Sequence, residues 1–200
     1  MARVYAGYHE SLGTDVAIKV MAGLALETNE ARSRRFAKEI EAVARLQHPS
    51  VVMIFDHGVI DETTAGQHPG LQVGLPWFAM EHCGGGSLAV HQFESWTELR
   101  AAIVATLDAL AYTHACGVLH RDLKPANVLV SDANDLGQGI KLADFGLALG
   151  EDDEVTSVHS SVGTPHYMAP EQVLGHWRDF EASTDLYAFG CLVWRLVTGR

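Results

Sequence analysis

A glycine-rich break, Gly84-Gly85-Gly86-Ser87, divides the 200-residue chain into two parts with different hydrophobic patterns. Before the break, short runs of Val, Ile, Tyr and Ala indicate strands, and after it long Ala- and Leu-rich stretches indicate helices. A run of glycines favours a flexible boundary over the continuation of a helix or strand. The sequence therefore predicts an α+β fold, with a small β-rich lobe followed by a larger, mainly helical lobe.

The first part is expected to hold a hairpin, one helix and two further strands. The hairpin strands are 3–10 and 15–21, on either side of a turn at Gly13. A helix over 29–46 follows, because apolar residues recur there at helical spacing and His48-Pro49 ends the pattern. The two further strands are predicted at 51–56 and 73–81.

The second part is expected to begin with a helix over 101–114 that has Leu107, Leu110 and Ala111 on one face. A last helix is predicted from about Ser183 to Val197. Between these helices stand short apolar runs that are too short for helices and are separated by polar loops. They are Val118–Leu119, Val128–Val130 and Ile140–Leu142.

Composition excludes several classes of protein. With 14 Lys and Arg against 25 Asp and Glu, the net charge is −11, which argues against a nucleic-acid partner. The sequence holds no apolar stretch long enough to span a membrane. Three widely spaced cysteines fit neither a disulfide framework nor a zinc site. The expected location is the cytoplasm, with any membrane anchor of a full-length protein lying outside these residues.

Lys19 stands in the strand Val16-Ala17-Ile18-Lys19, where a buried ammonium group needs an anionic partner. Glu39, in the predicted helix, lies beside the apolar stripe and is a candidate for that partner. Taken alone, Lys19 also fits an exposed edge-strand position, and Glu39 also fits a surface pair with Arg35.

Four short motifs follow in one order in the second part of the chain. They are HRDLKPAN at 120–127, DFG at 144–146, GTPHYMAPE at 163–171 and DLYAFG at 185–190. Each is weak alone, but together they specify well over a dozen residue identities, which makes coincidence negligible. The first motif places an acid, a base and an amide within eight residues, so their side chains are able to converge.

With the strand lysine, these motifs resemble those of the eukaryotic-type serine/threonine protein kinases, particularly their bacterial members, over essentially the whole chain. Lys124 and Gly163-Thr164 match the serine/threonine branch. The resemblance implies a two-lobed kinase fold, with the small lobe at 1–80, a hinge at 81–86 and the large lobe at 87–200. It implies ATP-dependent phosphorylation of Ser and Thr hydroxyls on protein substrates, with self-association for autophosphorylation.

The resemblance also assigns catalytic roles. Asp122 would accept the proton of the substrate hydroxyl or orient that hydroxyl. Lys124 would neutralise the γ-phosphate, and Thr164 would bridge to the catalytic loop.

Other residues would hold the nucleotide and its metal. Lys19 would bind the α- and β-phosphates of ATP and would be held by Glu39. Asn127 and Asp144 would bind Mg²⁺, or Mn²⁺ in its place, through oxygen atoms.

The expected adenine contacts rest on alignment to the family. The residues are Val4, Ala17, Met80, Glu81 and Cys83. Met80 would control access behind the adenine, although taken alone it fits core packing better. Glu81 and Cys83 would contact the purine edge through their backbone groups.

Arg121 precedes Asp122, an arrangement that in this family accompanies control by phosphorylation of the activation loop, here 144–171. Candidate sites in this loop are Thr156, Ser157, Ser160 and Ser161, with Thr156 or Ser157 favoured. Arg121 would pair with the phosphate. Ordinary polar loop composition accounts for these hydroxyls equally well.

The sequence departs from the family at both ends. The glycine-rich phosphate loop and the strand before it should precede Val4, and further helices, one with an arginine partner for Glu171, should follow Arg200. We therefore expect a catalytic domain trimmed at both ends, with the 200-residue chain alone poorly active or poorly soluble.

Two alternatives remain open at this stage. A pseudokinase, or nucleotide-binding scaffold, would bind ATP without transferring phosphate, although Lys19, Asp122, Asn127 and Asp144 are all present. A small-molecule phosphotransferase on a related fold would retain the two aspartates, but the segment 163–171 argues against it because it shapes a groove for protein substrates.

Overall fold

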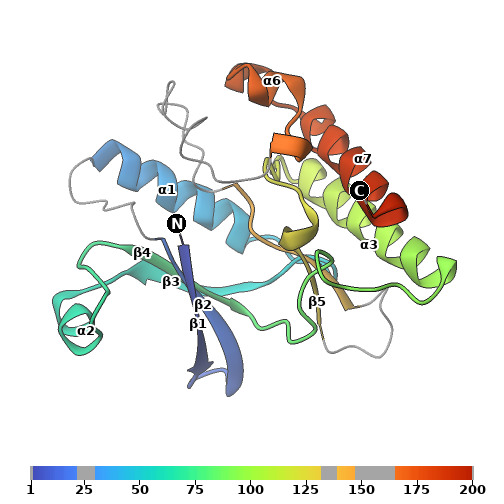
Figure 1. Ribbon diagram of the computed structural model, residues 1–200. Helices are drawn as coiled ribbons and strands as arrows, with labels where there is room; N and C mark the ends of the chain where they lie inside the picture. The colour runs from blue at the N-terminus through green and yellow to red at the C-terminus, as the bar shows by residue number, and fades with distance from the viewer. Residues whose placement is uncertain (1, 22–29, 132–138, 147–164, 200) are drawn as a thin grey trace. The chain divides into compact units, whose positions relative to one another are not determined.

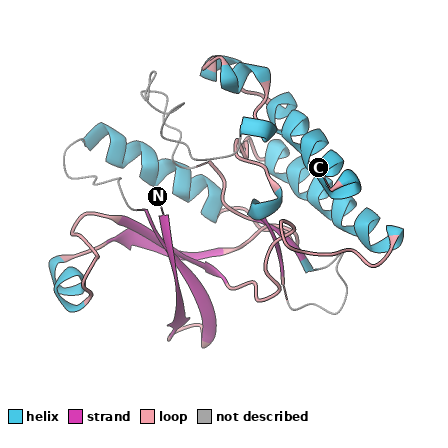
Figure 2. Ribbon diagram, viewed as in Figure 1, coloured by secondary structure: helices cyan, strands magenta, loops and turns pink. Residues whose placement is uncertain are grey.

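The computed structural model describes residues 2–21, 30–131, 139–146 and 165–199, and its chain forms two compact units. The first unit comprises Met1–Arg45 and Val52–His82, and the second comprises Leu46–Val51 and Cys83–Arg200. Figures 1 and 2 show a sheet in the first unit and mainly helices in the second, as the change of hydrophobic pattern at the glycine-rich break predicts.

The first unit is built on an antiparallel sheet of four strands in the order β1-β2-β4-β3. Its strands are β1 (Ala2–His9), β2 (Thr14–Met21), β3 (Ile54–Val59) and β4 (Pro76–Glu81), and its helices are α1 (Glu30–Ala44) and α2 (Glu62–Gln67). The predicted hairpin and the predicted long helix are therefore both present. In α1, Ile40 and Val43 of the predicted apolar stripe are buried.

Strand register places several predicted site residues on one face of this sheet. Val4 pairs with Lys19 across β1 and β2, and Ala17 pairs with Met80 across β2 and β4. Because side chains alternate along a strand, Ala17 and Lys19 face the same side. Lys19 also pairs with Phe78 of β4, and its Nζ lies 6.0 Å from the centre of the Phe78 ring.

The stretch from Val51 to the start of β4 departs from the prediction in two ways. The strand expected at 51–56 begins only at Ile54, because Val51 forms a bridge with Leu142 in the second unit. The stretch after β3 contains the unpredicted helix α2, whose N-cap Asp61 accepts a hydrogen bond from Thr64 N–H at 2.7 Å. That bond lowers the pKa of the Asp61 carboxyl.

The second unit is dominated by two long helices, α3 (Trp96–Ala115) and α7 (Ala182–Thr198), which contact each other and lie side by side in Figure 1. Its other elements are the strands β5 (Val128–Val130) and β6 (Ile140–Leu142), the short helix α6 (Pro170–Val173), and the 3₁₀ turns η2 (Pro125–Asn127), η3 (Pro165–Tyr167) and η4 (Trp177–Asp179). Strands β5 and β6 pair as an antiparallel ribbon.

Helix α3 does not bury the whole of the face that carries Leu107, Leu110 and Ala111. Leu110 is fully buried, but Leu107 is 41% exposed and Ala111 is exposed. The buried face of the helix is lined instead by small residues such as Ala102 and Ala109. In an Ala- and Leu-rich helix the apolar residues lie on every side, so periodicity does not single out the side that packs.

These elements hold the loop 116–127 between α3 and β5, and bring the end of β6 beside it. Gly117 has φ 74°, a left-handed conformation that ends the turn after α3 and favours glycine. No helix among the described residues combines the length and the apolar character needed to cross a membrane.

Candidate active site

The loop before β5 brings two predicted site residues into contact with the carboxylate of a third. Lys124 Nζ lies 2.7 Å from Asp122 Oδ2, and Asn127 Nδ2 donates to the same oxygen at 3.0 Å. The Asn127 amide also donates to the Asp122 carbonyl at 2.8 Å. The tight turn η2, with Pro125 at its first position, folds Asn127 back onto Asp122. The carboxylate is thus held by an ammonium group and an amide, and its side chain is 43% exposed.

The end of β6 adds Asp144 to this loop. Ala143, the residue before Asp144, donates its N–H to the Asn127 carbonyl at 2.9 Å. This bond links the end of β6 to the loop that carries Asn127. Asp144 itself has φ 59°, an uncommon left-handed backbone for a residue other than glycine. Asn127 uses its amide nitrogen on Asp122, so its amide oxygen is the atom that remains for a cation.

His120 is a buried scaffold for both segments, a role that the sequence prediction did not give it. Its Nε2 lies 2.8 Å from the Ala143 carbonyl oxygen, and its ring lies 4.8 Å from the Phe145 ring. Its own carbonyl accepts a hydrogen bond from Gly146 N–H at 2.8 Å. Burial lowers the pKa of His120, against smaller opposing effects of Asp185 and the Ala143 carbonyl. The neutral ring thus links the loop at 122 to the turn at 144–146.

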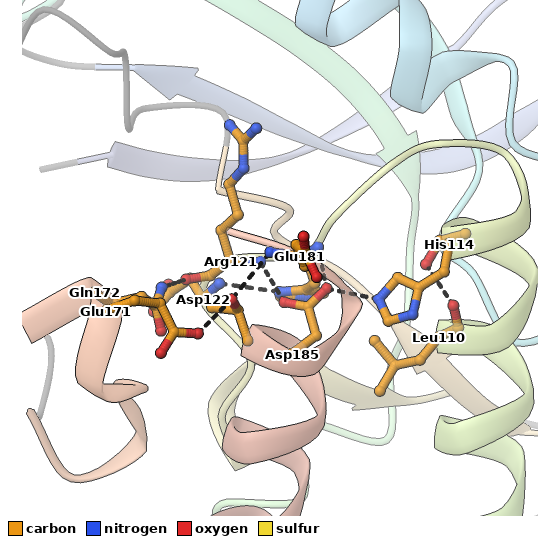
Figure 3. A network of polar contacts seen from close by, with 11 residues as sticks. Leu110, His114, Arg121, Asp122, Glu171, Gln172, Glu181 and Asp185 are labelled. Atoms are coloured by element: carbon orange, nitrogen blue, oxygen red, sulfur yellow. Dashed lines mark hydrogen bonds and ion pairs between the residues drawn. The ribbon is translucent and has the colours of Figure 1, made fainter. Parts of the chain in front are cut away.

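Asp185, near the start of α7, anchors the backbone on the other side of the loop. Its Oδ2 accepts from His120 N–H at 2.8 Å and lies 2.8 Å from His114 Nε2. Its Oδ1 accepts from Arg121 N–H at 2.8 Å. Figure 3 shows His114 and Arg121 approaching this carboxylate, which is 1% exposed. The sequence offered one signal for this anchor, a carboxylate within an otherwise apolar helix.

The helix α6 contributes two neighbouring polar side chains. Glu171 Oε1 accepts a hydrogen bond from the Thr184 hydroxyl at 2.6 Å, and this bond lowers the pKa of Glu171. Gln172 Nε2 donates to the Arg121 carbonyl at 2.7 Å. Thr184 of α7 is thus the partner of Glu171 among the described residues, and the expected pairing of Glu171 with an arginine beyond Arg200 stays a prediction. Gln172 was missed, because nothing in its sequence neighbourhood marks it.

The remaining predicted site residues belong to other parts of the chain. Val4, Ala17, Lys19 and Met80 lie on the sheet of the first unit, and Met80 is buried. Glu39 is half-buried on α1, and Glu81 ends β4, where its N–H donates to the Met53 carbonyl at 2.9 Å. Cys83 is half-buried in the second unit. Thr164, Thr156, Ser157, Ser160 and Ser161 lie outside the described residues.

Comparison with known proteins agrees with this geometry. The family model "Protein kinase domain" matches residues 1–200. Serine/threonine-protein kinase Pkn1 of Myxococcus xanthus is 38% identical over 209 residues, covering 100% of this chain and 27% of that protein. Serine/threonine-protein kinase PknB of Mycobacterium tuberculosis is 34% identical over 207 residues, covering 100% and 31%.

The fold is shared with a solved structure. The crystal structure of the Mycobacterium tuberculosis PknI kinase domain superimposes with a TM-score of 0.71 at 30% identity, covering 100% of this chain and 68% of that one. The α+β kinase fold predicted from the motifs is confirmed. The chain spans less than a third of the length of these curated relatives. The chain belongs to the protein kinase family, and its relatives are bacterial serine/threonine kinases.

Proposed function

We propose that this chain transfers the γ-phosphoryl group of ATP to serine and threonine hydroxyls of proteins, with Asp122 as the residue that orients the attacking hydroxyl and accepts its proton. The observation that carries the proposal is the contact of Lys124 and Asn127 with one Asp122 oxygen, at 2.7 and 3.0 Å. An ammonium group 2.7 Å from the base is placed to neutralise charge on a phosphoryl group that approaches it.

The residues at the metal positions fit a hard divalent cation, because Asn127 offers an amide oxygen and Asp144 a carboxylate. Mg²⁺, or Mn²⁺, would be held there and would supply charge neutralisation to the phosphates. Lys19 would hold the α- and β-phosphates, with Glu39 orienting Lys19. We propose the cytoplasm as the location of this chemistry, because ATP is supplied there.

The adenine would contact the sheet face that carries Val4 and Ala17, with Met80 behind it. Backbone groups of Glu81 and Cys83 would form the polar edge of this site. In this assignment the small lobe is 1–80, the hinge 81–86 and the large lobe 87–200.

Regulation by the activation loop is part of the proposal. Arg121 Nε is buried and meets no hydrogen-bond acceptor among the residues that the structure describes. A buried guanidinium nitrogen without an acceptor is unfavourable, and a phosphate on Thr156 or Ser157 would supply one. Transfer between two associated copies of the chain would place that phosphate. Loss of activation by phosphatase treatment in the wild type, but not in Arg121→Gln, tests this point.

Phosphotransfer from γ-labelled ATP to a mixture of Ser- and Thr-containing peptides tests the function directly. Asp122→Asn is expected to lower the rate about 10²- to 10⁴-fold while Mg²⁺-dependent stabilisation by ATP in a thermal shift stays unchanged. ATP stabilisation without any transfer in the wild type would instead favour the pseudokinase alternative. Transfer that survives Asp122→Asn would refute the assigned role.

A further inference from the structure

Arg121 has an unusual backbone beside the proposed catalytic aspartate. Its φ is 63°, and in the described part of the chain only Arg121 and Asp144 combine positive φ with a residue other than glycine. This conformation is disfavoured for a residue with a side chain, so surrounding contacts must hold it. The peptide bond that follows Arg121 carries the N–H of Asp122, so the backbone at 121 sets where the Asp122 carboxylate lies.

Two side chains from different elements hold the polar groups of Arg121. On one side, Asp185 Oδ1 of α7 accepts the Arg121 N–H at 2.8 Å. On the other side, Gln172 Nε2 of α6 donates to the Arg121 carbonyl at 2.7 Å. Figure 3 shows Gln172 and Asp185 approaching this backbone from different helices, with the Arg121 side chain extending away from Asp185.

The same Gln172 side chain also caps its own helix. Its Oε1 accepts a hydrogen bond from Ala169 N–H at 3.0 Å, which is the reach-back half of a capping box. Ala169 is fully buried, and Glu171, the residue before Gln172 in α6, is linked to α7 through Thr184. One amide thus joins the start of an anchored helix to the backbone at Arg121, using its oxygen at one end and its nitrogen at the other.

We propose that Gln172 is a positioning residue. It couples the segment 165–169, which leads into α6, to the position of the Asp122 carboxylate. The proposal rests on the proposed catalytic role of Asp122. A change in the segment that ends at Ala169 would move the Gln172 amide and, through the Arg121 carbonyl, the peptide bond that precedes Asp122. Such a movement changes the rate of phosphoryl transfer and leaves the binding of ATP unchanged.

Two substitutions separate this role from simple helix capping. Gln172→Glu keeps the oxygen that accepts from Ala169 but sets a second oxygen against the Arg121 carbonyl. Gln172→Met keeps the length of the side chain and loses both contacts. For the coupling role, kcat falls about 3- to 10-fold in Gln172→Met and about 10- to 100-fold in Gln172→Glu, with KM for ATP unchanged. For capping alone, the glutamate variant is close to wild type and the methionine variant is the weaker one.

Acid pH supplies a second signature. Partial burial against the Arg121 carbonyl oxygen is expected to raise the pKa of the introduced carboxyl, and its protonated form regains an O–H donor toward that carbonyl. The deficit of Gln172→Glu relative to wild type therefore shrinks as the pH falls from 7.5 toward 5.5. The exposed Gln92, in the loop before α3, provides the matched controls Gln92→Met and Gln92→Glu, whose kcat stays within about 2-fold of wild type.

Amide hydrogen exchange tests the coupling without relying on activity. In Gln172→Met, backbone amides of 120–124 are expected to exchange about 2- to 10-fold faster, with α3 unchanged. If the wild type transfers no phosphate but this local change occurs, the coupling stands and the proposed function fails. If the wild type is active and neither kcat nor exchange responds, the coupling is refuted and the function stands. Faster exchange throughout the second unit would show a general structural role and also refute it.

Discussion

Asp185→Asn is expected to destabilise the protein strongly, although it replaces one atom by another of nearly equal size. The carboxylate accepts three hydrogen bonds at 2.8 Å, with His114 Nε2 and His120 N–H on Oδ2 and Arg121 N–H on Oδ1. An amide keeps one acceptor oxygen, which serves the two donors at Oδ2. Its NH₂ group then faces the Arg121 N–H, so a donor meets a donor.

The magnitude follows from that count. One charge-assisted bond contributes about 1.5 to 3 kcal/mol, and the buried N–H of Arg121 is left without an acceptor. We expect the free energy of unfolding to fall by about 2 to 4 kcal/mol. For a chain of this size that corresponds to a loss of roughly 5 to 15 °C in Tm. Asp185→Ala, which removes all three acceptor contacts, is expected to cost more.

Urea denaturation followed by circular dichroism measures this change, with Asp179→Asn as the matched control. Asp179 also lies near a histidine, His176 Nδ1, but at 3.7 Å and with 69% of its side chain exposed. A solvated pair of this kind contributes about 0 to 1 kcal/mol. Equal effects of the two substitutions, or a change below about 0.5 kcal/mol for Asp185→Asn, would refute the reasoning.

Three further outcomes are expected. Leu110→Ala, at a fully buried position, should lower the free energy of unfolding by about 2 to 5 kcal/mol. Leu107→Ala, at a position that is 41% exposed, should change it by less than about 1 kcal/mol. Similar values for the two variants would contradict the assigned buried face of α3. Tyr112→Phe removes the hydroxyl that accepts Gln47 N–H at 2.9 Å and should cost about 0.5 to 1.5 kcal/mol in the same denaturation assay. Burial holds the pKa of His120 below its ordinary value of 6.5, so as the pH falls the unfolded chain binds this proton before the folded chain does. The contribution of neutral His120 to the free energy of unfolding is therefore fully present above pH 6.5. It is lost as the pH falls below 6.5, by up to about 1.4 kcal/mol per pH unit. The difference in stability between pH 7.5 and 5.5 should be smaller in His120→Gln, and an unchanged difference would mean that another group is responsible.

Much of the fold was predictable because its signals are local. The hairpin of β1 and β2 and the helices α1 and α7 follow from periodicity and turn residues within a few positions. The start of β3 was not predictable, since Val51 is drawn away by a bridge to Leu142 in a distant part of the chain. The packed face of α3 was not predictable either, because small residues line most of it and leucines lie on both the buried and the exposed sides.

The residues of the candidate active site divide along the same line. Asp122, Lys124 and Asn127 lie within six positions of one another, so their residue types and spacing already indicated a common centre. The residues that hold this centre in place come from far along the chain. Arg121 N–H meets a side chain 64 positions away, and its carbonyl meets one 51 positions away.

That separation has a physical cause. A residue that touches the substrate acts through its own side chain, so the local sequence must contain the right residue type at that position. A left-handed residue such as Arg121 instead needs any donor and any acceptor that the fold brings to its carbonyl and its N–H, and many residue types on many elements meet that need. Gln172 and Asp185 are one such solution, and only the folded chain identifies them. Substitutions at these two positions should therefore alter catalysis or stability as strongly as changes within the loop, although neither side chain belongs to the group that surrounds the Asp122 carboxylate.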